Sequence, residues 1–594
     1  MIAPMTKYSF ILLNEEQEGL FDKLLEIGLV DVTRSVKPVD DHSHQMMGEV
    51  ELLTGLINGL GKIEIPEDAE REFIDGDIVR LTGGMLMRYA DDTVEIKQLQ
   101  KEVQNLRAWG QFDPARLQAL SDAGMPIHFH ILPNKQFKPG WQEKYPVSVI
   151  HTDQAHTWFV VVGSDPLPGE IHVPETDVTG KEKELQEKEA HFRKTMRRIA
   201  SAKDRIGELE QRRAEAYTNL DRYLAHAAVV PAAENTLVTL VGYAPTENEE
   251  AVTAALEEAG VFFLKEDAQA EDNPPISFRN NKFVRMFEVL TDMYGRPAYN
   301  GFDPTPFIAV FFLLFFAFCM GDAGYGLILI GIGLLLKKVD SFKGFAPLVV
   351  TLGIGTTVIG FLFHTFFSMD ISTWKMFEPV RGLFLPSKIA GYDGTMVLAL
   401  IVGIIHLCLA MVVKTYNQTR VKGFANSLGT WGWTLLIVGG TAVGALALVG
   451  VLDKDLTKWI IIVLGIVSAV GIFLLNDLHR NPLINIGSGL WESYNTVTGL
   501  LGDVLSYLRL YALGLAGSML GKAFNDIGAM ILGDGHSIPL WIPFILIVLV
   551  GHTLNIAMAA LGAFVHPLRL NFLEFFKNSG YEAAGREYHP LKKQ

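Results

Sequence analysis

Apolar positions in the first 300 residues recur with the periods of strands and helices in alternation. Alternating apolar positions predict four short strands, and helical spacing follows two of them, so we predict a proximal α/β lobe built from residues 1–60 and 232–270. The predicted strands are 8–13, 30–36, 236–243 and 261–264, and the predicted helices are 16–27 and 247–259.

Between the two pieces of this lobe, apolar residues repeat at coiled-coil spacing. The first seam is Ile96, Leu99, Val103 and Leu106, and the second is Leu185, Phe192, Ile199 and Ile206. We predict two arms, at about 67–110 and 178–226, which pair antiparallel because a globular insert separates them. The insert is predicted to be a distal α/β lobe at 115–175, with strands at 127–132, 147–151 and 157–162.

From Pro304 onward, the apolar runs become long enough to cross a bilayer. We predict an α-helical membrane domain of eight transmembrane helices over residues 301–594, with the last two long and tilted, after a cytoplasmic domain over residues 1–300. The predicted spans are 305–320, 325–336, 345–367, 396–413, 428–452, 459–475, 490–532 and 541–576.

Charge and hydropathy divide the chain at the same place. Hydrophobic residues make up 49% of the chain and the mean hydropathy is +0.23, whereas the net charge of −15 indicates a large soluble part. Acidic residues such as Glu15 and Glu16 argue against a cleavable signal peptide. Lys337, Lys338 and Lys343 lie in a loop on the side of the N-terminal domain, so we predict a multi-pass protein of the cell membrane with both termini cytoplasmic.

One arginine lies deep inside the longest apolar run. Arg509 is too far from either end of the 490–532 segment to reach the membrane surface by snorkelling. A charge at mid-bilayer costs about 3 to 15 kcal/mol, so it is retained only where it faces a cavity, a counter-ion or a pathway. We predict a role in ion translocation, and the alternative is an internal ion pair that joins two helices.

A second arginine, Arg569, lies in the last predicted span, near the cytoplasmic end, where snorkelling is an alternative explanation. Helical spacing places it on a polar stripe, and a similar stripe precedes Arg509 in the previous span. We predict that both arginines act in ion translocation between two tilted helices with facing polar stripes. The residues predicted to line half-channels along the stripes are Glu492, Asn495, Asp503, Ser506, Asn555, His566 and Glu574.

The soluble half carries no motif for catalysis. Gly61 and Lys62 resemble the end of a phosphate-binding loop. The motif requires a glycine where this chain has Leu56 and a serine or threonine where it has Ile63, so it fails at both positions. The histidines at 128 and 130 share one face of a strand with ordinary polar neighbours, so no metal site is expected. We predict no catalytic residue, no cofactor and no nucleic-acid partner.

Two motifs near the C-terminal end carry a family resemblance. The stretches LGDVLSYLRLYALGLAG at 501–517 and FVHPLRLNFLEFF at 564–576 resemble the paired-helix core of the membrane stator of rotary V/A-type ATPases, called subunit a or subunit I. The stretches PPISFRNN, FEVLTDMYGRPAYNGFDPTP, GDAGYG and GIIHL are also similar, and the resemblance covers the whole chain and indicates a prokaryotic member. His364 and Ser368 replace glycines that are common in the family, and Gly517 and Ala559 stand at positions that are polar in eukaryotic members.

The resemblance implies a stator subunit that is not an enzyme by itself but conducts ions for an ATP-driven pump or an ATP synthase. Members of the family pass ions through two offset half-channels to a ring of c-type subunits, each with a buried carboxylate. This implies that Arg509 is the counter-charge of these carboxylates and that Arg569 assists it.

The resemblance also implies a set of partners. These are the c-type ring, the peripheral-stalk subunits of the E and G type and the lipid bilayer, and a contact with the central-stalk ring adaptor of the C/d type is left open. Small residues next to Arg509 are expected to let the ring approach closely, and the alternative is ordinary tight helix packing. They are Ala512, Gly514, Ala516, Gly517 and Gly521.

Two other classes of protein remain open on the sequence. One is a secondary ion transporter with its own substrate site, which would be expected to show internal repeats with interrupted helices. The other is a structural membrane anchor for the coiled coil, which would have no need of two buried arginines. The sequence does not distinguish protons from sodium ions, or ATP synthesis from hydrolysis.

Overall fold

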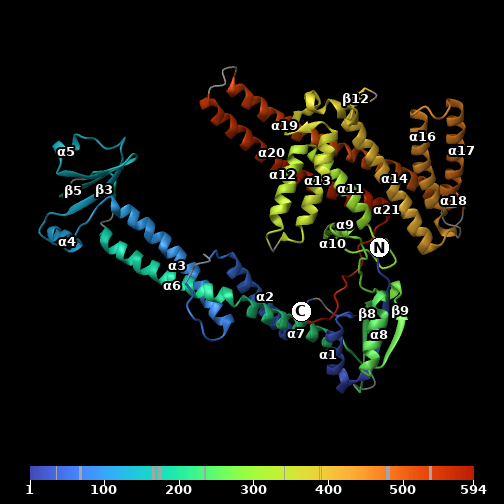
Figure 1. The fold of residues 1–594 in the computed structure, drawn as a ribbon, viewed down its shortest axis with the longest axis horizontal. Coiled ribbons are helices and arrows are strands. Elements are labelled where there is room, and N and C mark those ends of the chain that lie inside the picture. The colour runs from blue at the N-terminus through green and yellow to red at the C-terminus, as the bar shows by residue number, and fades with distance from the viewer. Residues whose placement is uncertain are drawn as a thin grey trace. The chain divides into compact units, whose positions relative to one another are not determined.

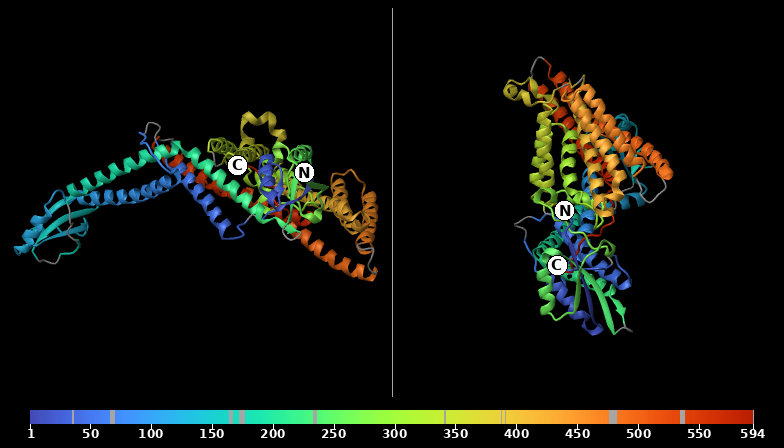
Figure 2. Two further views of the ribbon diagram at one scale, coloured as in Figure 1. Left: turned by 90° about the horizontal axis from the view of Figure 1, so that it is seen from below. Right: turned by 90° about the vertical axis from the view of Figure 1, so that its right-hand side faces the viewer.

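The computed structural model describes residues 1–34, 37–65, 70–163, 167–171, 177–232, 236–339, 342–386, 388–389, 391–475, 482–533 and 538–593. The chain forms two compact units, each of which can be followed in Figures 1 and 2. Unit 1 consists of Met1–Ile11, Leu29–Asp31 and Val241–Pro590. Unit 2 consists of Leu12–Gly28, Val32–Leu240 and the last residues of the chain.

A small sheet contains strands from both ends of the N-terminal half. Its order is β2-β8-β1-β9, with β7 on β8, and β1 pairs antiparallel with β9 so that Thr6 lies opposite Asp267. The predicted strand at 30–36 is short, because β2 covers two residues and positions 35 and 36 lie outside the described residues. The strands are β1 (Met5–Leu13), β2 (Asp31–Val32), β7 (Val230–Ala232), β8 (Leu237–Pro245) and β9 (Phe263–Asp267), with helices α1 (Gln17–Ile27) and α8 (Glu249–Glu258).

Four long helices make up most of unit 2. They are α2 (Asp41–Lys62), α3 (Ile78–Arg107), α6 (Val178–Asp204) and α7 (Ile206–Ala227), and α3 packs on α6 while α2 packs on α7. Lys188 pairs with Glu95, and Lys181 pairs with Glu102 at 3.3 Å, so α3 and α6 run antiparallel.

Helix α2 was not predicted, since its residues up to position 60 were assigned to the proximal lobe. Asp40 and Ser43 form a capping box at its start, and the Tyr223 hydroxyl donates a hydrogen bond to Asp40. These hydrogen bonds, that of Tyr223 first, lower the pKa of Asp40 to about 2. The second predicted arm is also not one helix, because Arg205 separates α6 from α7.

A second sheet in unit 2 contains strands where the sequence predicted them. Its order is β4-β5-β3-β6, and Phe159 and Val161 of β5 are fully buried. Its elements are α4 (Pro114–Asp122), β3 (Ile127–Pro133), α5 (Trp141–Lys144), β4 (Val147–Thr152), β5 (His156–Val162) and β6 (Glu170–Ile171).

Unit 1 is mainly apolar helices. In the part of the chain that the structure describes, five stretches are long and apolar enough to span a membrane: Gly394–Lys422, Ala425–Leu448, Lys454–Phe473, Ile484–Leu532 and Trp541–Ser579. Three shorter apolar helices precede them, namely α11 (Thr305–Met320), α12 (Ala323–Leu336) and α13 (Ala346–Leu362). Each of the eight predicted spans overlaps one of these stretches, but only the five longer ones meet the length needed to cross a membrane. These five stretches make the chain a multi-pass membrane protein.

The remaining elements of unit 1 complete this array. They are α9 (Lys282–Arg285), α10 (Glu288–Tyr294), α14 (Gly394–Lys422), α15 (Leu428–Thr434), a π-helix (Leu435–Gly439), α16 (Gly440–Leu448), α17 (Lys454–Phe473), α18 (Pro482–Ser506), α19 (Leu508–Leu532), α20 (Trp541–Arg569), a second π-helix (Leu570–Phe575) and α21 (Phe576–Ser579). Helices α19 and α20 pack side by side and run obliquely to α11, α12 and α13 in Figure 1.

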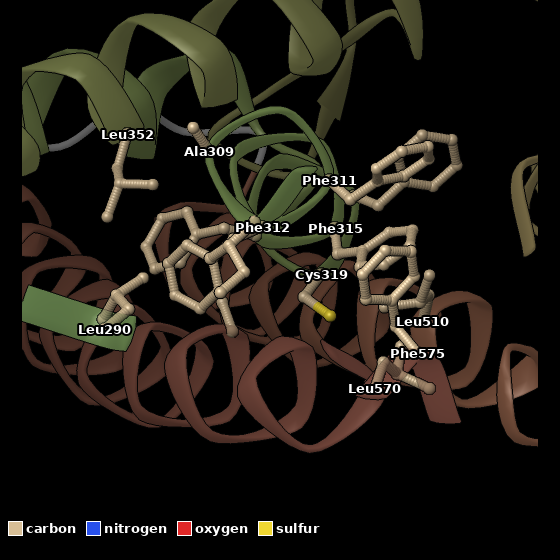
Figure 3. Close-up of a cluster of buried hydrophobic side chains, with 14 of the residues drawn as sticks. Leu290, Ala309, Phe311, Phe312, Phe315, Cys319, Leu352, Leu510, Leu570 and Phe575 are labelled. Carbon is tan, nitrogen blue, oxygen red and sulfur yellow. The ribbon is translucent and has the colours of Figure 1, made fainter. Parts of the chain in front are cut away.

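Helix α11 is the centre of the hydrophobic core of unit 1. It packs against α13, α19 and α20, and its phenylalanines fill the spaces between these helices. In Figure 3, Phe312 points toward Leu290, whereas Phe315 lies beside Leu510 and Phe575. Because α11 is buried on several sides, its apolar residues show no helical stripe, as expected for a central helix.

Helices α12 and α13 approach each other closely at glycines. A Cβ at Gly326 would lie 2.5 Å from the backbone nitrogen of Thr357, and a Cβ at Gly360 would lie 2.2 Å from that of Ala323. Small residues permit such contact between backbones, which is a common way for helices to associate in membranes.

The third predicted span, 345–367, ends earlier than predicted. Helix α13 stops at Leu362, and His364, Phe367 and Ser368 have φ values of 52°, 47° and 57°. Side chains disfavour this left-handed region, which explains why glycine is common at such positions.

A single carboxylate stabilises this turn. Asp322, which is 4% exposed, caps α12 by accepting hydrogen bonds from the backbone nitrogens of Gly324 (2.8 Å) and Tyr325 (3.3 Å). The same carboxylate accepts hydrogen bonds from the nitrogens of Phe367 (2.9 Å) and Ser368 (2.6 Å). The aspartate of GDAGYG therefore joins the start of α12 to the turn after α13.

Replacing this carboxylate should destabilise unit 1. We expect Asp322→Ala to lower the free energy of unfolding by about 2–4 kcal/mol, because four buried N–H groups lose a charged acceptor. Asp393→Ala is the matched control, since Asp393 caps the exposed start of α14 and its loss should cost about 1 kcal/mol. Thermal unfolding of the detergent-solubilised protein measures the difference, and equal losses in the two variants would contradict it.

Candidate functional site

The site predicted around Arg509 lies at an interruption between two helices. The predicted span 490–532 is divided into α18, which begins at Pro482, and α19, and Tyr507 separates them. The nitrogen of Tyr507 donates to the carbonyl of Val504 at 3.2 Å, and that of Leu510 donates to the carbonyl of Tyr507 at 3.0 Å. Hydrogen bonds to the third preceding residue tighten the backbone here, as is frequent at functional hinges.

One nitrogen of the Arg509 guanidinium group has no hydrogen-bond partner among the described residues. The side chain is half-buried, and its Nη1 atom is buried without a hydrogen-bond acceptor among the described residues. Its charge acts on Cys319, His566 and Glu574, which lie near it on α11, α20 and the second π-helix. The predicted alternative of an internal ion pair therefore has no partner for Nη1 in the described part of the chain.

The last predicted span contains a π-helix directly after Arg569. Pro567 has no backbone N–H, and the wider turn of the π-helix begins three residues later, at Leu570. The change of period places Glu574 inside, where it is 4% exposed, while Arg569 is exposed. The proline is visible in the sequence. The sequence-based prediction assumed a constant rotation of about 100° per residue, so it did not include the separation of the faces of Arg569 and Glu574 by the π-helix.

Polar groups cluster between Arg509 and the C-terminal end of this helix. Asp503 accepts hydrogen bonds from the Nδ2 atom of Asn578 at 2.7 Å and from the Nζ atom of Lys577 at 3.5 Å. The hydroxyl of Ser506 donates to the carbonyl of Gly502 at 3.0 Å. We call Asp503, Ser506, Glu574, Lys577 and Asn578 the polar cluster.

The structure separates the other residues of the predicted stripes. Glu492 and Asn495 are exposed, and His566 is half-buried near both arginines. Asn555 is 1% exposed, and its Nδ2 atom donates to the Tyr325 hydroxyl and to the Gly517 carbonyl, both at 2.8 Å. Asn555 therefore joins α20 to α12 and α19, and it does not belong to the polar cluster.

A cavity of about 190 Å³ lies along α19 on the other side of Arg509, and the sequence did not reveal it. Leu510, Gly514 and Ser518 form one wall, and residues of the α13–α14 connection and of the start of α14 form another. The polar residues of that second wall are His364, Thr365, Asp393 and Thr395, and Asp370 pairs with His364 at 3.1 Å.

The polar cluster and the cavity lie toward opposite ends of the helices. The cluster includes residues at the C-terminal end of the last span, whereas the cavity is lined by Gly321 and by residues of the α13–α14 connection. Along α18 and α19, Asp503 and Ser506 of the cluster precede Arg509, whereas Leu510, Gly514 and Ser518 of the cavity follow it. Arg509 lies between them along α18 and α19, so polar groups approach it from both sides.

The small residues beside Arg509 fall into two groups. Ala512 and Ala516 are exposed and continue the face of Arg509 at helical spacing. Gly514 and Gly521 face their own chain, because added Cβ atoms would lie 2.9 Å from the Phe318 carbonyl oxygen and 2.0 Å from the Ser368 hydroxyl oxygen. For these two glycines, the alternative of tight internal packing is the one that the structure shows.

Comparison with known proteins gives matches to one family. Residues 169–375 match the V-type ATPase 116kDa subunit family. The A-type ATP synthase subunit I of Methanocaldococcus jannaschii is 31% identical over 386 residues, which cover 59% of this chain and 54% of that protein. The chain thus spans about half the length of this archaeal relative. The V-type ATP synthase subunit I of Chlamydia trachomatis is 24% identical, and the match covers 100% of this chain and 99% of that protein.

Solved structures also match this chain. One of them is the crystal structure of the cytoplasmic N-terminal domain of subunit I, homolog of subunit a, of V-ATPase. The match covers 45% of this chain and 100% of that domain, at 12% sequence identity. The TM-score of 0.21 is too low to support an argument about the fold.

The two asparagines of the predicted stripes should differ in their contribution to stability. We expect Asn555→Leu to lower the free energy of unfolding by about 1–3 kcal/mol, because it removes the two buried hydrogen bonds that the side-chain amide donates to the Tyr325 hydroxyl and the Gly517 carbonyl. Asn495→Leu, at an exposed position, should change it by less than about 0.5 kcal/mol. Denaturation of each purified variant tests this, and an Asn555→Leu protein as stable as the Asn495→Leu protein would refute the structural role.

Proposed function

Because the chain belongs to the V-type ATPase 116kDa subunit family, we propose that it is the membrane stator subunit of a rotary V/A-type ATPase or ATP synthase. It is not catalytic by itself. It provides two half-channels for protons or sodium ions and presents Arg509 to a rotating ring of c-type subunits.

The observation that carries this proposal is the incomplete partnering of Arg509. Its Nη1 atom has no acceptor among the described residues, although an arginine remains charged in any protein environment. A carboxylate supplied by a second protein would complete this site and lose its own proton there, because a nearby positive charge favours the ionised form. When the ring turns, the carboxylate leaves Arg509 and can be protonated again.

The surface around the arginines is suited to a moving partner. Ala512 and Ala516 extend the exposed face of α19 beyond Arg509, and Arg569 lies on the exposed face of α20 with Leu561 and Val565. The small and apolar side chains at these alanine, leucine and valine positions offer no hydrogen bond that would hold the ring at one angle. Rotation requires such a surface, since each new ring position must have nearly the same contact energy.

The polar cluster and the cavity are proposed as the two half-channels. The cluster, with Asp503, Ser506 and Glu574, leads to Arg509 from the side of Lys577, which we take as cytoplasmic. The cavity beside Gly514 and Ser518 leads to it from the opposite side. The guanidinium group between them blocks a direct leak by repelling cations.

Unit 2 is proposed to anchor the peripheral stalks. Its antiparallel helices α3 and α6 carry a chain of ion pairs along their length, and a four-stranded sheet follows at one end of the pair. A long helical pair resists bending, which a stator requires when the ring exerts torque. Subunits of the E and G type are the expected partners of its lobes.

Removing the charge of Arg509 should abolish coupled transport. We expect Arg509→Ala to reduce ATP-driven ion uptake into reconstituted vesicles at least about 100-fold, with the complex still assembled, since the ring carboxylate loses its counter-charge. Arg509→Lys should not restore it fully, because an ammonium group lacks the planar fork and can lose its proton in a dry site. Lys522→Ala, an exposed charge on the same helix, is the control, and coupled uptake near the wild-type rate in Arg509→Ala would refute the proposal.

Arg569 should be easier to replace than Arg509. Its side chain is exposed, so we expect Arg569→Lys to retain measurable coupled transport and Arg569→Ala to be slowed or partly uncoupled. The ratio of ions taken up to ATP hydrolysed, measured in paired variants of both arginines, gives the order. Loss of all transport in Arg569→Lys, equal to that in Arg509→Ala, would show that the two arginines form one inseparable site.

A further inference from the structure

The residue that separates α18 from α19 is itself held by a buried hydrogen bond. Tyr507 is completely buried, two residues before Arg509. Its hydroxyl is hydrogen-bonded at 2.9 Å to the Nδ1 atom of His406, which lies in α14 and is also completely buried. The pair joins segments 101 residues apart in the chain.

The imidazole ring of His406 is fixed on both faces. It stacks on Phe311 with a centroid distance of 4.1 Å and an interplanar angle of 30°, and on Phe575 at 4.7 Å and 5°. Phe315 meets it edge-on at 5.1 Å. A ring held between aromatic neighbours cannot follow Tyr507 if Tyr507 moves, so the hydrogen bond restrains the tyrosine and not the histidine.

A glycine on the same helix makes this approach possible. A Cβ atom at Gly403 would lie 2.3 Å from the Cγ atom of Tyr507, so any side chain there would displace the phenol ring. Gly403 and His406 are one turn apart in α14 and contact the same ring. The GIIHL motif thus supplies both the space and the hydrogen-bond partner for Tyr507.

We propose that His406 is a positioning residue for Arg509, acting through Tyr507. The interruption between α18 and α19 sets the direction in which the first turn of α19 presents Arg509. A buried phenol without a partner is costly, so the hydrogen bond favours the one backbone arrangement that keeps the hydroxyl at His406. Loss of the bond allows the tight turn at Tyr507 to relax, and the arginine two residues later turns with it. The functional consequence rests on the proposed role of Arg509, but the restraint on the backbone does not.

Hydrogen exchange in the assembled complex tests the restraint directly. We expect the backbone amides of residues 508–511 to exchange about fivefold faster in His406→Phe and in Tyr507→Phe, since each change removes one buried hydrogen bond and keeps an aromatic ring. The double variant should add little to either single change, because both remove the same bond. His406→Gln, whose amide can still bond the phenol, should restore slow exchange.

The control removes a similar bond elsewhere on α14. Thr415 is buried and is hydrogen-bonded to Thr434 of α15, so Thr415→Val should leave exchange at 508–511 unchanged. Unchanged exchange in both His406→Phe and Tyr507→Phe, or equal acceleration in Thr415→Val, would overturn the inference. If His406→Phe prevents assembly, the exchange rates at 508–511 are compared between Tyr507→Phe and His406→Gln. Faster exchange in Tyr507→Phe alone supports the inference, and equal rates overturn it.

Transport measurements separate this inference from the proposed function. With faster exchange established, we expect the ions taken up per ATP hydrolysed to fall at least twofold in His406→Phe and to recover in His406→Gln. Faster exchange with a wild-type ratio would overturn the positioning of Arg509. A normal ratio in Arg509→Ala would refute the proposed function, whereas the exchange result would still stand.

Discussion

The energetic cost of a permanent charge in an apolar helix pair governs the organisation of unit 1. Arg509 cannot become neutral, and the described residues leave one of its guanidinium nitrogens without an acceptor. Such a group is tolerated only if the surrounding backbone is held firmly and a partner can approach it. The aromatic core around α11 supplies the firmness, because it packs against α13, α19 and α20 together.

The same region stores local strain that a buried carboxylate offsets. Three residues with side chains adopt positive φ after α13, and Asp322 binds the backbone nitrogens of two of them while capping α12. The turn borders the cavity beside α19 through His364 and contacts Gly521 through Ser368. Helix capping, turn geometry and the shape of the cavity are therefore coupled through one side chain.

Polar residues inside the apolar helices have different physical roles, although they look alike in sequence. Asn555 satisfies a tyrosine hydroxyl and a backbone carbonyl, which makes it a bridge between helices. Asp503 and Glu574 lie near charged and amide groups beside Arg509, and Asn495 is exposed. Burial and partners separate these roles, whereas helical periodicity alone had placed all four on two stripes.

Periodicity in the sequence determined most of the elements, and the chemistry of arginine determined where to look for function. Alternation of apolar residues located β1, β3, β5 and β8, and long apolar runs located the helices of unit 1, because local burial patterns must match the period of the element. Only the tertiary structure decided the packing of α2 on α7, the end of α13, the π-helix that contains Glu574 and the interruption at Tyr507. These features depend on contacts between residues far apart in the chain, such as His406 with Tyr507 and Asp322 with Phe367, and no local pattern encodes such contacts.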